Sequence, residues 1–528
     1  YSLNKYRKLH YNEQIQYIKN RFSNKVFIMD EIHQTRSNKI SETDSKKIRP
    51  YLEMIARYAD NTHFILLSAT PMYNITNEII WVLNLLLWND DRGPISHKIF
   101  SKNKLELKSS KTNDRVYDNN KQVLLNKSRG YISFLRGENP FTFPIKLPPL
   151  IEGTPESTYF VPTPKKYIYK KQIFEFDQQD SEDSDTCFTY INPTGIPFLY
   201  PDILSDWQYT FINNELEKNL SIDLSSSSLL SKYSNIIYPQ LLDSNVPDDS
   251  ELGTMNDVFE EMSAYKYNYT NKEYPCMKPE LLQTHSIKMY NIIHCISNSL
   301  PIRKKGYTSG DSLEQVQEPG GGIIFIYSKF INYGVKPMTF ALEELGFNRY
   351  VLNEEANYME KNLLIRKRND DESFCAYNKC RLKDIDQSDT EQIEHFKKTF
   401  TQARYVYLDG SIQKNMLNHL VKESRGEGLS NKSNHYGENI MVILGTGVVE
   451  VGLSFFNVRQ IHILEPWYHF NAMVQVVGRG SRNFSHKHLD KEYRNIMIYL
   501  HVATRKNTTA DNDRIELSDE RLYRESYC

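Results

Sequence analysis

The stretch of residues 439–486 contains two short apolar runs, 441–444 and 460–464, followed by a segment with helical spacing. Runs of this length and composition predict strands that are buried on both faces. Similar runs followed by helical patterns occur at 25–29, 63–67, 322–327 and 404–410. Strands that alternate with helices in this way predict an α/β fold built on a parallel, doubly wound sheet.

The helical segment after the second run carries four residues in one register. Gln475, Gly478, Arg479 and Arg482 stand at i, i+3, i+4 and i+7, which predicts that they share one helix face. Arginine remains charged at any working pH and can hold phosphate oxygens with its planar fork, so this face suits a polyanion. The alternative interpretation is a solvated basic helix end.

Two carboxylates follow the first apolar run directly. Residues 25–31 read KVFIMDE, so the expected strand ends in Asp30 and Glu31, with His33 two residues later. Parallel sheets place their ligands at the carboxyl ends of the strands. One carboxylate there can hold Mg²⁺ through water, and the other can orient an attacking water molecule.

The next run, residues 63–67, ends in a short polar sequence. The residues that follow it are Ser68, Ala69 and Thr70. The sequence resembles superfamily 2 helicases and translocases in the order of three features. These are a strand followed by DEIH, a strand followed by SAT, and a helix that carries QxxGRxxR. Residues 30–33 resemble motif II of that superfamily and 68–70 resemble motif III, while 445–453 resemble motif V and 475–482 resemble motif VI.

The resemblance is closest to one viral branch of the superfamily. The stretches 66–74, 130–144 and 457–486 resemble helicases of nucleocytoplasmic large DNA viruses. These helicases include the poxvirus nucleoside triphosphatase I and the small early-transcription-factor subunit, with asfarvirus and giant-virus relatives. The resemblance covers about 27–149 and 278–501.

This resemblance implies two RecA-like lobes with ATP bound between them. Asp30 would then hold Mg²⁺ through water, Glu31 would polarise the attacking water, and Gln475 would help to position water or nucleotide. Arginines from the second lobe would reach the γ-phosphate when the lobes close. The nucleotide-binding residues implied are Asp30, Glu31, Gly452, Gly478, Arg479 and Arg482.

Two further groups of residues take their roles from the same resemblance. His33, Ser68, Ala69 and Thr70 would couple the nucleotide state to the interface between the lobes. Gly445, Thr446, Gly447 and Trp467 would contact nucleic acid, although Trp467 is also explained as a core aromatic residue. Relatives commonly have Glu directly before the motif V glycine, whereas here Val451 precedes Gly452.

The phosphate-cradling pattern GxxxxGK[ST], which such an enzyme needs ahead of motif II, does not occur in this sequence. We therefore expect an incomplete first lobe and a chain that is a fragment of a longer polypeptide. The expected domains are the ATP-binding lobe at 1–150, an accessory insertion at 151–277, the second RecA-like lobe at 278–505 and a charged tail at 506–528.

Composition limits the other classes of function. Lys and Arg number 65 against 66 Asp and Glu, so a nucleic-acid footprint must be a local patch. The six cysteines are scattered, which favours a reducing compartment. Cys375 and Cys380 form the only close pair, without two further zinc ligands at a convincing spacing. The longest apolar run, 79–88, is too short to span a membrane.

The sequence therefore predicts an ATP- and Mg²⁺-dependent helicase or translocase that acts on nucleic acid, with DNA favoured over RNA. The resemblance points to viral transcription, with the viral RNA polymerase as a partner, in the viral factory of the host cytoplasm and in the virion. The alternatives are a viral RNA helicase, a replication helicase, and a helicase-like scaffold without turnover.

Overall fold

The computed structural model divides into two compact units, Tyr1–Gly137 and Glu138–Cys528. The boundary expected from the sequence lies later, at residue 150. The described residues are 10–35, 44–68, 78–96, 99, 114–133, 142–147, 149, 166–169, 172–175, 199–218, 224–239, 252–263, 266–270, 273–298, 322–350, 370–408, 414–425, 434–447, 453–468, 470–505 and 514–527.

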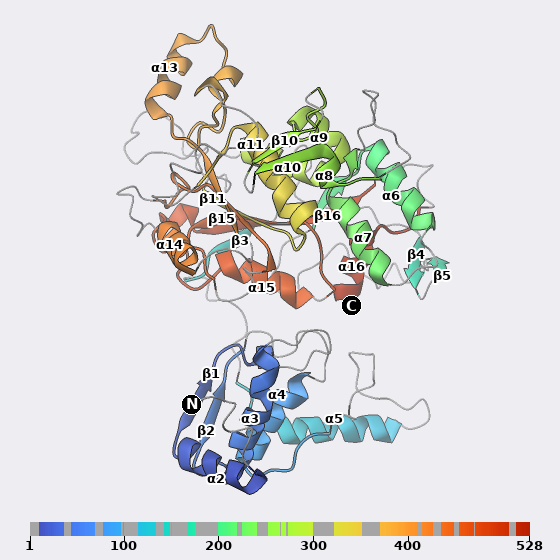
Figure 1. The fold of residues 1–528 in the computed structure, drawn as a ribbon, viewed down its shortest axis with the longest axis vertical. Coiled ribbons are helices and arrows are strands. Elements are labelled where there is room, and N and C mark those ends of the chain that lie inside the picture. The colour runs from blue at the N-terminus through green and yellow to red at the C-terminus, as the bar shows by residue number, and fades with distance from the viewer. Residues whose placement is uncertain are drawn as a thin grey trace. The chain divides into compact units, whose positions relative to one another are not determined.

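Unit 1 is built on two parallel strands and the helices packed against them (Figure 1). Its elements are α2 (Tyr11–Phe22), β1 (Val26–Met29), η1 (Ile32–Thr35), α3 (Asp44–Tyr58), β2 (His63–Leu66), α4 (Glu78–Asn89) and α5 (Asp114–Ser128). Phe27 and Phe64 stack on the inner face of the strand pair, with ring centroids 5.2 Å apart. Val26 and Ile28 project from the other face and are 58% and 66% exposed, so the described residues leave one apolar face of this pair open.

Helix α3 begins earlier than the sequence indicated. Proline is favoured at the first position of a helix, so the apolar spacing after Pro50 predicts a helix over 50–58. In the structure α3 begins at Asp44 and has Pro50 inside it. A proline inside a helix removes one backbone hydrogen bond and costs about 3 kcal/mol. The polar residues before Pro50 include good helix formers, and the apolar face formed by Leu52, Ile55 and Ala56 is buried. The burial of that face offsets the cost of the proline.

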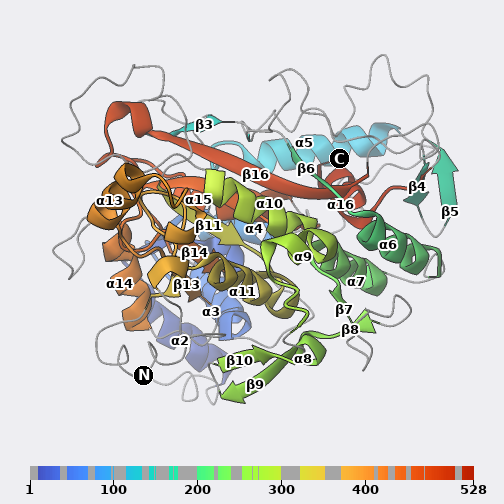
Figure 2. The same cartoon turned by 90° about the horizontal axis from the view of Figure 1, so that it is seen from above.

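Unit 2 is organised around an eight-stranded sheet whose described pairings are all parallel. The strand order is β12-β13-β14-β11-β15-β16-β3, and β6 also pairs with β16. These strands are β3 (Ile145–Leu147), β6 (Leu199–Ile203), β11 (Ile323–Tyr327), β12 (Asn348–Arg349), β13 (Arg404–Leu408), β14 (Val442–Gly445), β15 (Val458–Ile463) and β16 (Asn495–Thr504). Figure 2 shows β3 near one end of the long strand β16 and β6 near the other.

Helices cover both faces of this sheet (Figure 1). Ile324 and Ile326 of β11 pack with α10 and α11 in one core, while Ile323 and Phe325 pack with α15 in a second core. The helices of unit 2 are α6 (Asp206–Lys218), α7 (Leu224–Asn235), α8 (Met255–Val258), α9 (Pro279–His285), α10 (Ile287–Asn298), α11 (Lys336–Leu345), α13 (Thr390–Thr399), α14 (Lys414–Ser424), α15 (Phe470–Gly480) and α16 (Ser518–Tyr527). Short antiparallel pairs are formed by β4 (Lys166–Tyr169) with β5 (Gln172–Glu175), β7 (Tyr238–Pro239) with β8 (Leu252–Gly253), and β9 (Phe259–Ser263) with β10 (Lys266–Tyr269). The α/β fold class built on parallel sheets is confirmed.

Two regions that we expected to be peripheral are integral parts of unit 2. The region 151–277 was expected to be an accessory insertion, yet its strand β6 adds to the main sheet. The last residues were expected to form a charged tail, yet 514–527 include the buried helix α16. Its charges form buried ion pairs, Arg514 with Glu520 and Lys288 with Asp519. The amino-acid composition gives the number of such charges, but it does not show that they form ion pairs with one another inside the protein.

None of the helices in the described residues is both long and apolar enough to cross a membrane.

Two buried histidines make the stability of unit 2 depend on pH. Burial lowers the pKa of His285 and of His486 to about 4. In the unfolded chain both histidines titrate near pH 6.5. Between about pH 6.5 and 4 the unfolded state therefore binds more protons, and the free energy of unfolding falls by about 1.4 kcal/mol per pH unit for each histidine. Burial raises the pKa of Glu465 and Asp519. These two carboxyl groups therefore increase the free energy of unfolding as the pH falls, opposite to the effect of the histidines.

We therefore predict that the free energy of unfolding falls less steeply with decreasing pH in His486→Gln than in the wild type. Glutamine can still donate to the Val458 carbonyl that His486 Nε2 contacts at 2.7 Å, but it does not titrate. Urea unfolding at pH 7, 6 and 5 is expected to show a shallower loss of stability in the variant. Equal slopes would contradict the assignment of a buried, neutral His486.

Candidate functional site

In unit 1 the carboxyl ends of β1 and β2 are held side by side. The Leu67 amide donates to Met29 O at 2.8 Å, and the Ile32 amide donates to Leu67 O at 3.1 Å. The residues that follow the two strands, Asp30–Glu31 and Ser68, therefore lie at the same edge of the sheet. This is the edge at which parallel sheets bind ligands.

His33 joins these two strand ends. Its Nδ1 is hydrogen-bonded to Ser68 Oγ at 2.8 Å and lies 3.2 Å from Glu31 Oε2. The ring is 5% exposed, so this contact is shielded from solvent. The DEIH and SAT sequences are thus in direct contact, while Ala69 and Thr70 lie outside the described residues.

Glu31 has an unusual backbone and an unsatisfied oxygen. Its φ is 54°, in the left-handed region that non-glycine residues rarely adopt and that often marks functional sites. Its amide donates to Asp30 Oδ1 at 2.9 Å, which orients the neighbouring carboxylate. Its buried Oε2 makes no hydrogen bond within the described part of the chain, although it lies close to His33. An acceptor in this position is suited to a water molecule.

In unit 2, three loops meet at the carboxyl edge of the sheet. Ser328 and Lys329 follow β11, Gly445–Gly447 end β14, and Glu465 follows β15 closely. The Ser328 amide donates to Gly445 O at 3.2 Å, which ties two of the loops together. Thr446 is buried and its amide contacts Leu408 O at 3.2 Å, whereas Gly447 is exposed. Gly452 lies outside the described residues.

The predicted common face of Gln475, Gly478, Arg479 and Arg482 is only partly formed. Helix α15 ends at Gly480, so Arg482 lies beyond the helix and the expectation of two arginines on one face is wrong. A Cβ at Gly480 would lie 3.1 Å from side chains of Val458 and Ile461. Glycine therefore lets the end of α15 pack closely against β15, and the chain leaves the helix there.

The two arginines have different environments. Arg479 is 4% exposed, and its Nη1 donates to Leu453 O at 3.2 Å. Arg482 is exposed, and its Nε donates to Gly478 O at 2.7 Å. Gln475 and Gly478 are half-buried on α15, and a Cβ added at Gly478 would meet no described atom within 4 Å.

Residues 354–484 match the helicase conserved C-terminal domain. This part of unit 2 is therefore similar to a helicase C-terminal domain, in agreement with the resemblance seen in the sequence. The subtype of helicase stays a prediction.

Relatives along most of the chain come from a giant virus. Two proteins of Acanthamoeba polyphaga mimivirus with ATP-dependent RNA helicase in their names are 22% and 23% identical to this chain, over 93% and 95% of its length. The chain spans only 63% and 40% of those proteins. A protein of African swine fever virus named early transcription factor large subunit homolog is 31% identical over 110 residues, which are 21% of this chain and 9% of that protein.

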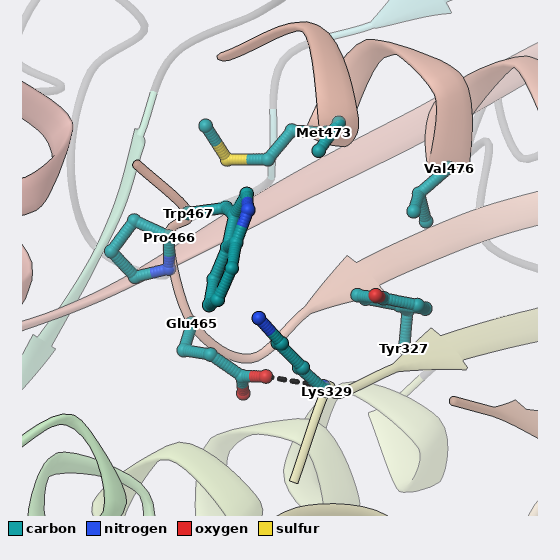
Figure 3. Close-up of a pocket in the computed structure, with 8 residues that line it drawn as sticks. Tyr327, Lys329, Glu465, Pro466, Trp467, Met473 and Val476 are labelled. Atoms are coloured by element: carbon teal, nitrogen blue, oxygen red, sulfur yellow. Dashed lines mark hydrogen bonds between the residues drawn. The ribbon is translucent and has the colours of Figure 1, made fainter. Parts of the chain in front are cut away.

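The structure adds Lys329 and Glu465, which the sequence analysis missed, to the sheet edge that carries the predicted Trp467. Lys329, Glu465 and Trp467 line a hollow together with apolar residues of α15 (Figure 3). Glu465 closely follows a strand of a parallel sheet, as Asp30 does, so the rule that identified Asp30 also applies to Glu465. The sequence carried no comparable signal for Lys329.

Glu465 belongs to a buried polar network. It accepts hydrogen bonds from Ser328 Oγ at 2.9 Å, from Asn235 Nδ2 at 2.8 Å and from the Lys329 amide. Lys288 donates to Asn235 Oδ1 at 3.0 Å and pairs with Asp519 of α16. Cys375 and Cys380 are free thiols, and the described residues contain no group of three or more potential metal ligands.

The contrast between the two arginines predicts different effects on stability. Arg479→Ala is expected to lower the free energy of unfolding by about 1–3 kcal/mol, because it leaves the Leu453 carbonyl without this donor and removes a buried side chain. Arg482→Ala is expected to change it by less than about 0.5 kcal/mol, since the side chain is exposed. Urea unfolding of both variants measures the difference, and equal losses would contradict the assigned environments.

Proposed function

We propose that this chain is part of an ATP-dependent nucleic-acid helicase or translocase, a nucleic-acid-stimulated ATPase. The observation that carries the proposal is the His33–Ser68 hydrogen bond of 2.8 Å, which joins the ends of the DEIH and SAT strands. A hydrogen bond between two strand ends at a ligand-binding edge allows a change at the carboxylates to reach the neighbouring loop. The similarity of residues 354–484 to a helicase C-terminal domain supports the same function.

The carboxylates of unit 1 fit ATP and Mg²⁺. Mg²⁺ is commonly bound through one or two carboxylates together with water and substrate phosphates, and Asp30 is the exposed carboxylate at the end of β1. The unsatisfied Oε2 of Glu31 fits the residue that orients an attacking water. When bound, Mg²⁺ supplies charge stabilisation to the phosphate oxygens. Asp30 would hold it, while His33 keeps Glu31 in place.

Of the two arginines, Arg482 fits the residue that contacts the γ-phosphate. Its guanidinium is exposed on the loop after α15, whereas Arg479 is buried. An exposed arginine can reach a phosphate when lobes close, and such a contact contributes only in the closed state. Arg479 would then position the loop that carries Arg482. Gln475 and Gly478 would lie on α15 along the path of the Arg482 side chain.

The sheet edge of unit 2 fits a nucleic-acid strand. Gly447 is exposed beside the buried Thr446, so backbone groups of this loop are accessible to phosphates, which carry no sequence information. Trp467 adds an aromatic surface. We propose DNA as the strand and viral transcription in the viral factory and virion, with the viral RNA polymerase as partner, since a transcription-factor homolog is among the relatives. The names of the mimivirus relatives favour an RNA helicase as the second candidate.

ATP hydrolysis by the full-length polypeptide tests the proposal. Phosphate release is measured without nucleic acid and with single-stranded DNA, duplex DNA or RNA. We expect DNA to stimulate turnover at least about tenfold, and Glu31→Gln to abolish turnover because it removes the carboxylate that orients water. Stimulation by RNA alone would support the second candidate. The absence of hydrolysis under every condition would support a helicase-like scaffold instead.

Arg482→Ala is expected to lower turnover at least about a hundredfold while nucleotide affinity changes little, because the contact forms mainly in the transition state. The measurements are steady-state ATP hydrolysis and equilibrium binding of a fluorescent ATP analogue. Lys487→Ala removes an exposed positive charge from the same loop and serves as the matched control. Wild-type turnover in Arg482→Ala would overturn this assignment.

A further inference from the structure

We propose that Cys375 and Cys380 form a redox-sensitive modification site, a dithiol that closes reversibly to a disulfide on reaction with a small disulfide such as oxidised glutathione. The pair stands in a hairpin that packs against the chain just before β13, at the amino edge of the sheet of unit 2. Lys329 and Trp467 lie at the carboxyl edge of the same sheet. The redox site and the proposed function are therefore independent of each other.

The two cysteines stand opposite each other in the hairpin. Phe374 and Arg381 form an antiparallel bridge, so Cys375 and Cys380 occupy the next pair of positions, and the Cys375 amide donates to Cys380 O at 2.9 Å. Directly opposed residues of antiparallel strands point to the same face, with Cα atoms about 5.5 Å apart in a hydrogen-bonded pair. A disulfide usually spans about 4.4–6.8 Å between Cα atoms. The backbone spacing of this pair therefore suits a disulfide.

The hairpin is held by contacts on two sides. The Phe374 amide donates to Gly346 O at 3.0 Å, at the end of α11, and the Phe374 ring stacks on Phe347 with centroids 5.0 Å apart. The Ala376 amide donates to Thr401 O at 2.7 Å. Because these contacts fix the backbone and do not involve the thiols, the disulfide can close without a rearrangement of the hairpin.

The sulfur of Cys375 is surrounded by N–H donors. The side chain is fully buried, and its Sγ accepts from the Asn378 amide at 3.5 Å, from Asn378 Nδ2 at 3.3 Å and from the Thr401 amide at 3.4 Å. A neutral thiol is only a weak acceptor. Three donors directed at one sulfur therefore suit the thiolate, which is the form that attacks a disulfide.

A buried lysine lies next to this sulfur in the fold. Lys379 is 4% exposed, and its Nζ contacts Met441 Sδ at 3.4 Å. Burial lowers the pKa of Lys379 to about 7, while the negative forms of Cys375 and Glu438 act in the opposite direction. A buried ammonium requires a negative charge nearby. Lys379 is therefore a positioning residue whose charge favours the thiolate of Cys375.

Cys380 is the more accessible thiol of the pair. It is partly exposed, whereas Cys375 is buried, so a small disulfide in solution meets Cys380 first. Burial raises the pKa of the Cys380 thiol to about 11, with further increases from Cys375 and Asp384 that Arg381 opposes. Little thiolate of Cys380 is present at neutral pH. The first step is therefore slow, and the site responds to sustained oxidation rather than to a brief change.

The reaction consists of two thiol–disulfide exchanges. Cys380 loses its proton to solvent, and its thiolate attacks one sulfur of oxidised glutathione, so that the S–S bond of glutathione breaks and one glutathione leaves and takes up a proton. The Cys375 thiolate then attacks the Cys380 sulfur of this mixed disulfide, which forms the Cys375–Cys380 bond and releases the second glutathione. The cysteine pair is oxidised, and glutathione receives its electrons and protons.

Peptide mapping of the full-length protein tests the pair. The folded protein is incubated with oxidised glutathione, the remaining thiols are blocked with N-ethylmaleimide, and the protein is unfolded and digested with trypsin without reduction. Trypsin cuts after Lys379, which stands between the two cysteines, so the disulfide is detected as two peptides linked through sulfur. We expect the linked peptides after oxidation and their separation after treatment with dithiothreitol.

Single substitutions separate the two exchanges. Cys375→Ser is expected to stop at the mixed disulfide of Cys380 with glutathione, and Cys380→Ser is expected to leave the buried Cys375 reduced. Lys379→Met is expected to accumulate the mixed disulfide, because it removes the charge that favours the Cys375 thiolate. Cys295→Ser, which removes another partly exposed thiol, is the matched control and is expected to give the linked peptides at the level of the wild type.

The pH dependence shows which thiol reacts first. Well below its pKa, the thiolate fraction of a cysteine grows about tenfold for each pH unit. Because the pKa of Cys380 is about 11, we expect its free thiol to disappear about tenfold faster at pH 8 than at pH 7. Equal rates at the two pH values would contradict the assignment of Cys380 as the first thiol to react.

Three results would overturn the redox pair. They are linked peptides that form only in urea, a mixed disulfide as the sole product in the wild type, and a disulfide of Cys375 that persists in Cys380→Ser. A thermal melt of each variant shows whether it is folded. If Cys375→Ser unfolds, the wild type and Lys379→Met still test the pair. None of these results depends on ATP hydrolysis, so the redox pair and the proposed function can fail separately.

Discussion

Parallel pairing of β11 with β14 and β15 is the constraint on which the candidate site of unit 2 depends. Parallel strands that are buried on both faces bring their carboxyl ends to one edge, and only the residues beyond those ends remain accessible. Lys329 and Trp467 therefore meet at one place although they are far apart in sequence. Unit 1 uses the same arrangement on a smaller scale, with β1 and β2 presenting Glu31 and Ser68.

Buried charges complete this edge. Lys288, Glu465 and Asp519 are each at most 3% exposed, and burying a charge without a partner is costly. Removing one member would leave the others uncompensated, so the loops that hold Lys329 and Trp467 are fixed by groups from α7, α10 and α16. The attraction within such a network is largely offset by the cost of desolvating its charges, so the network adds little net stability.

The sequence predicted the strands and the residues that follow them well, because an apolar run or a short motif depends only on residues that are neighbours in the chain. Asp30 and Ser68 lie where the pattern placed them, just after the paired strands β1 and β2. The sequence pattern gave wrong expectations where contacts between residues far apart in the chain determine the structure. Close packing of Gly480 against β15 ends α15 before Arg482, and buried ion pairs turn an apparently charged tail into the core helix α16. Lys329 became a candidate only once its ammonium was seen over Trp467.

The central claim is that the binding of nucleotide and the binding of nucleic acid are energetically coupled. The most direct measurement is the affinity of the full-length protein for a single-stranded oligonucleotide with a non-hydrolysable ATP analogue, with ADP and without nucleotide. Coupling between two sites typically changes affinity at least about fivefold, and it acts reciprocally on the nucleotide. We predict such a difference between the ATP-like and ADP states. Equal strand affinities in all three states would contradict the account, whatever the rate of ATP hydrolysis.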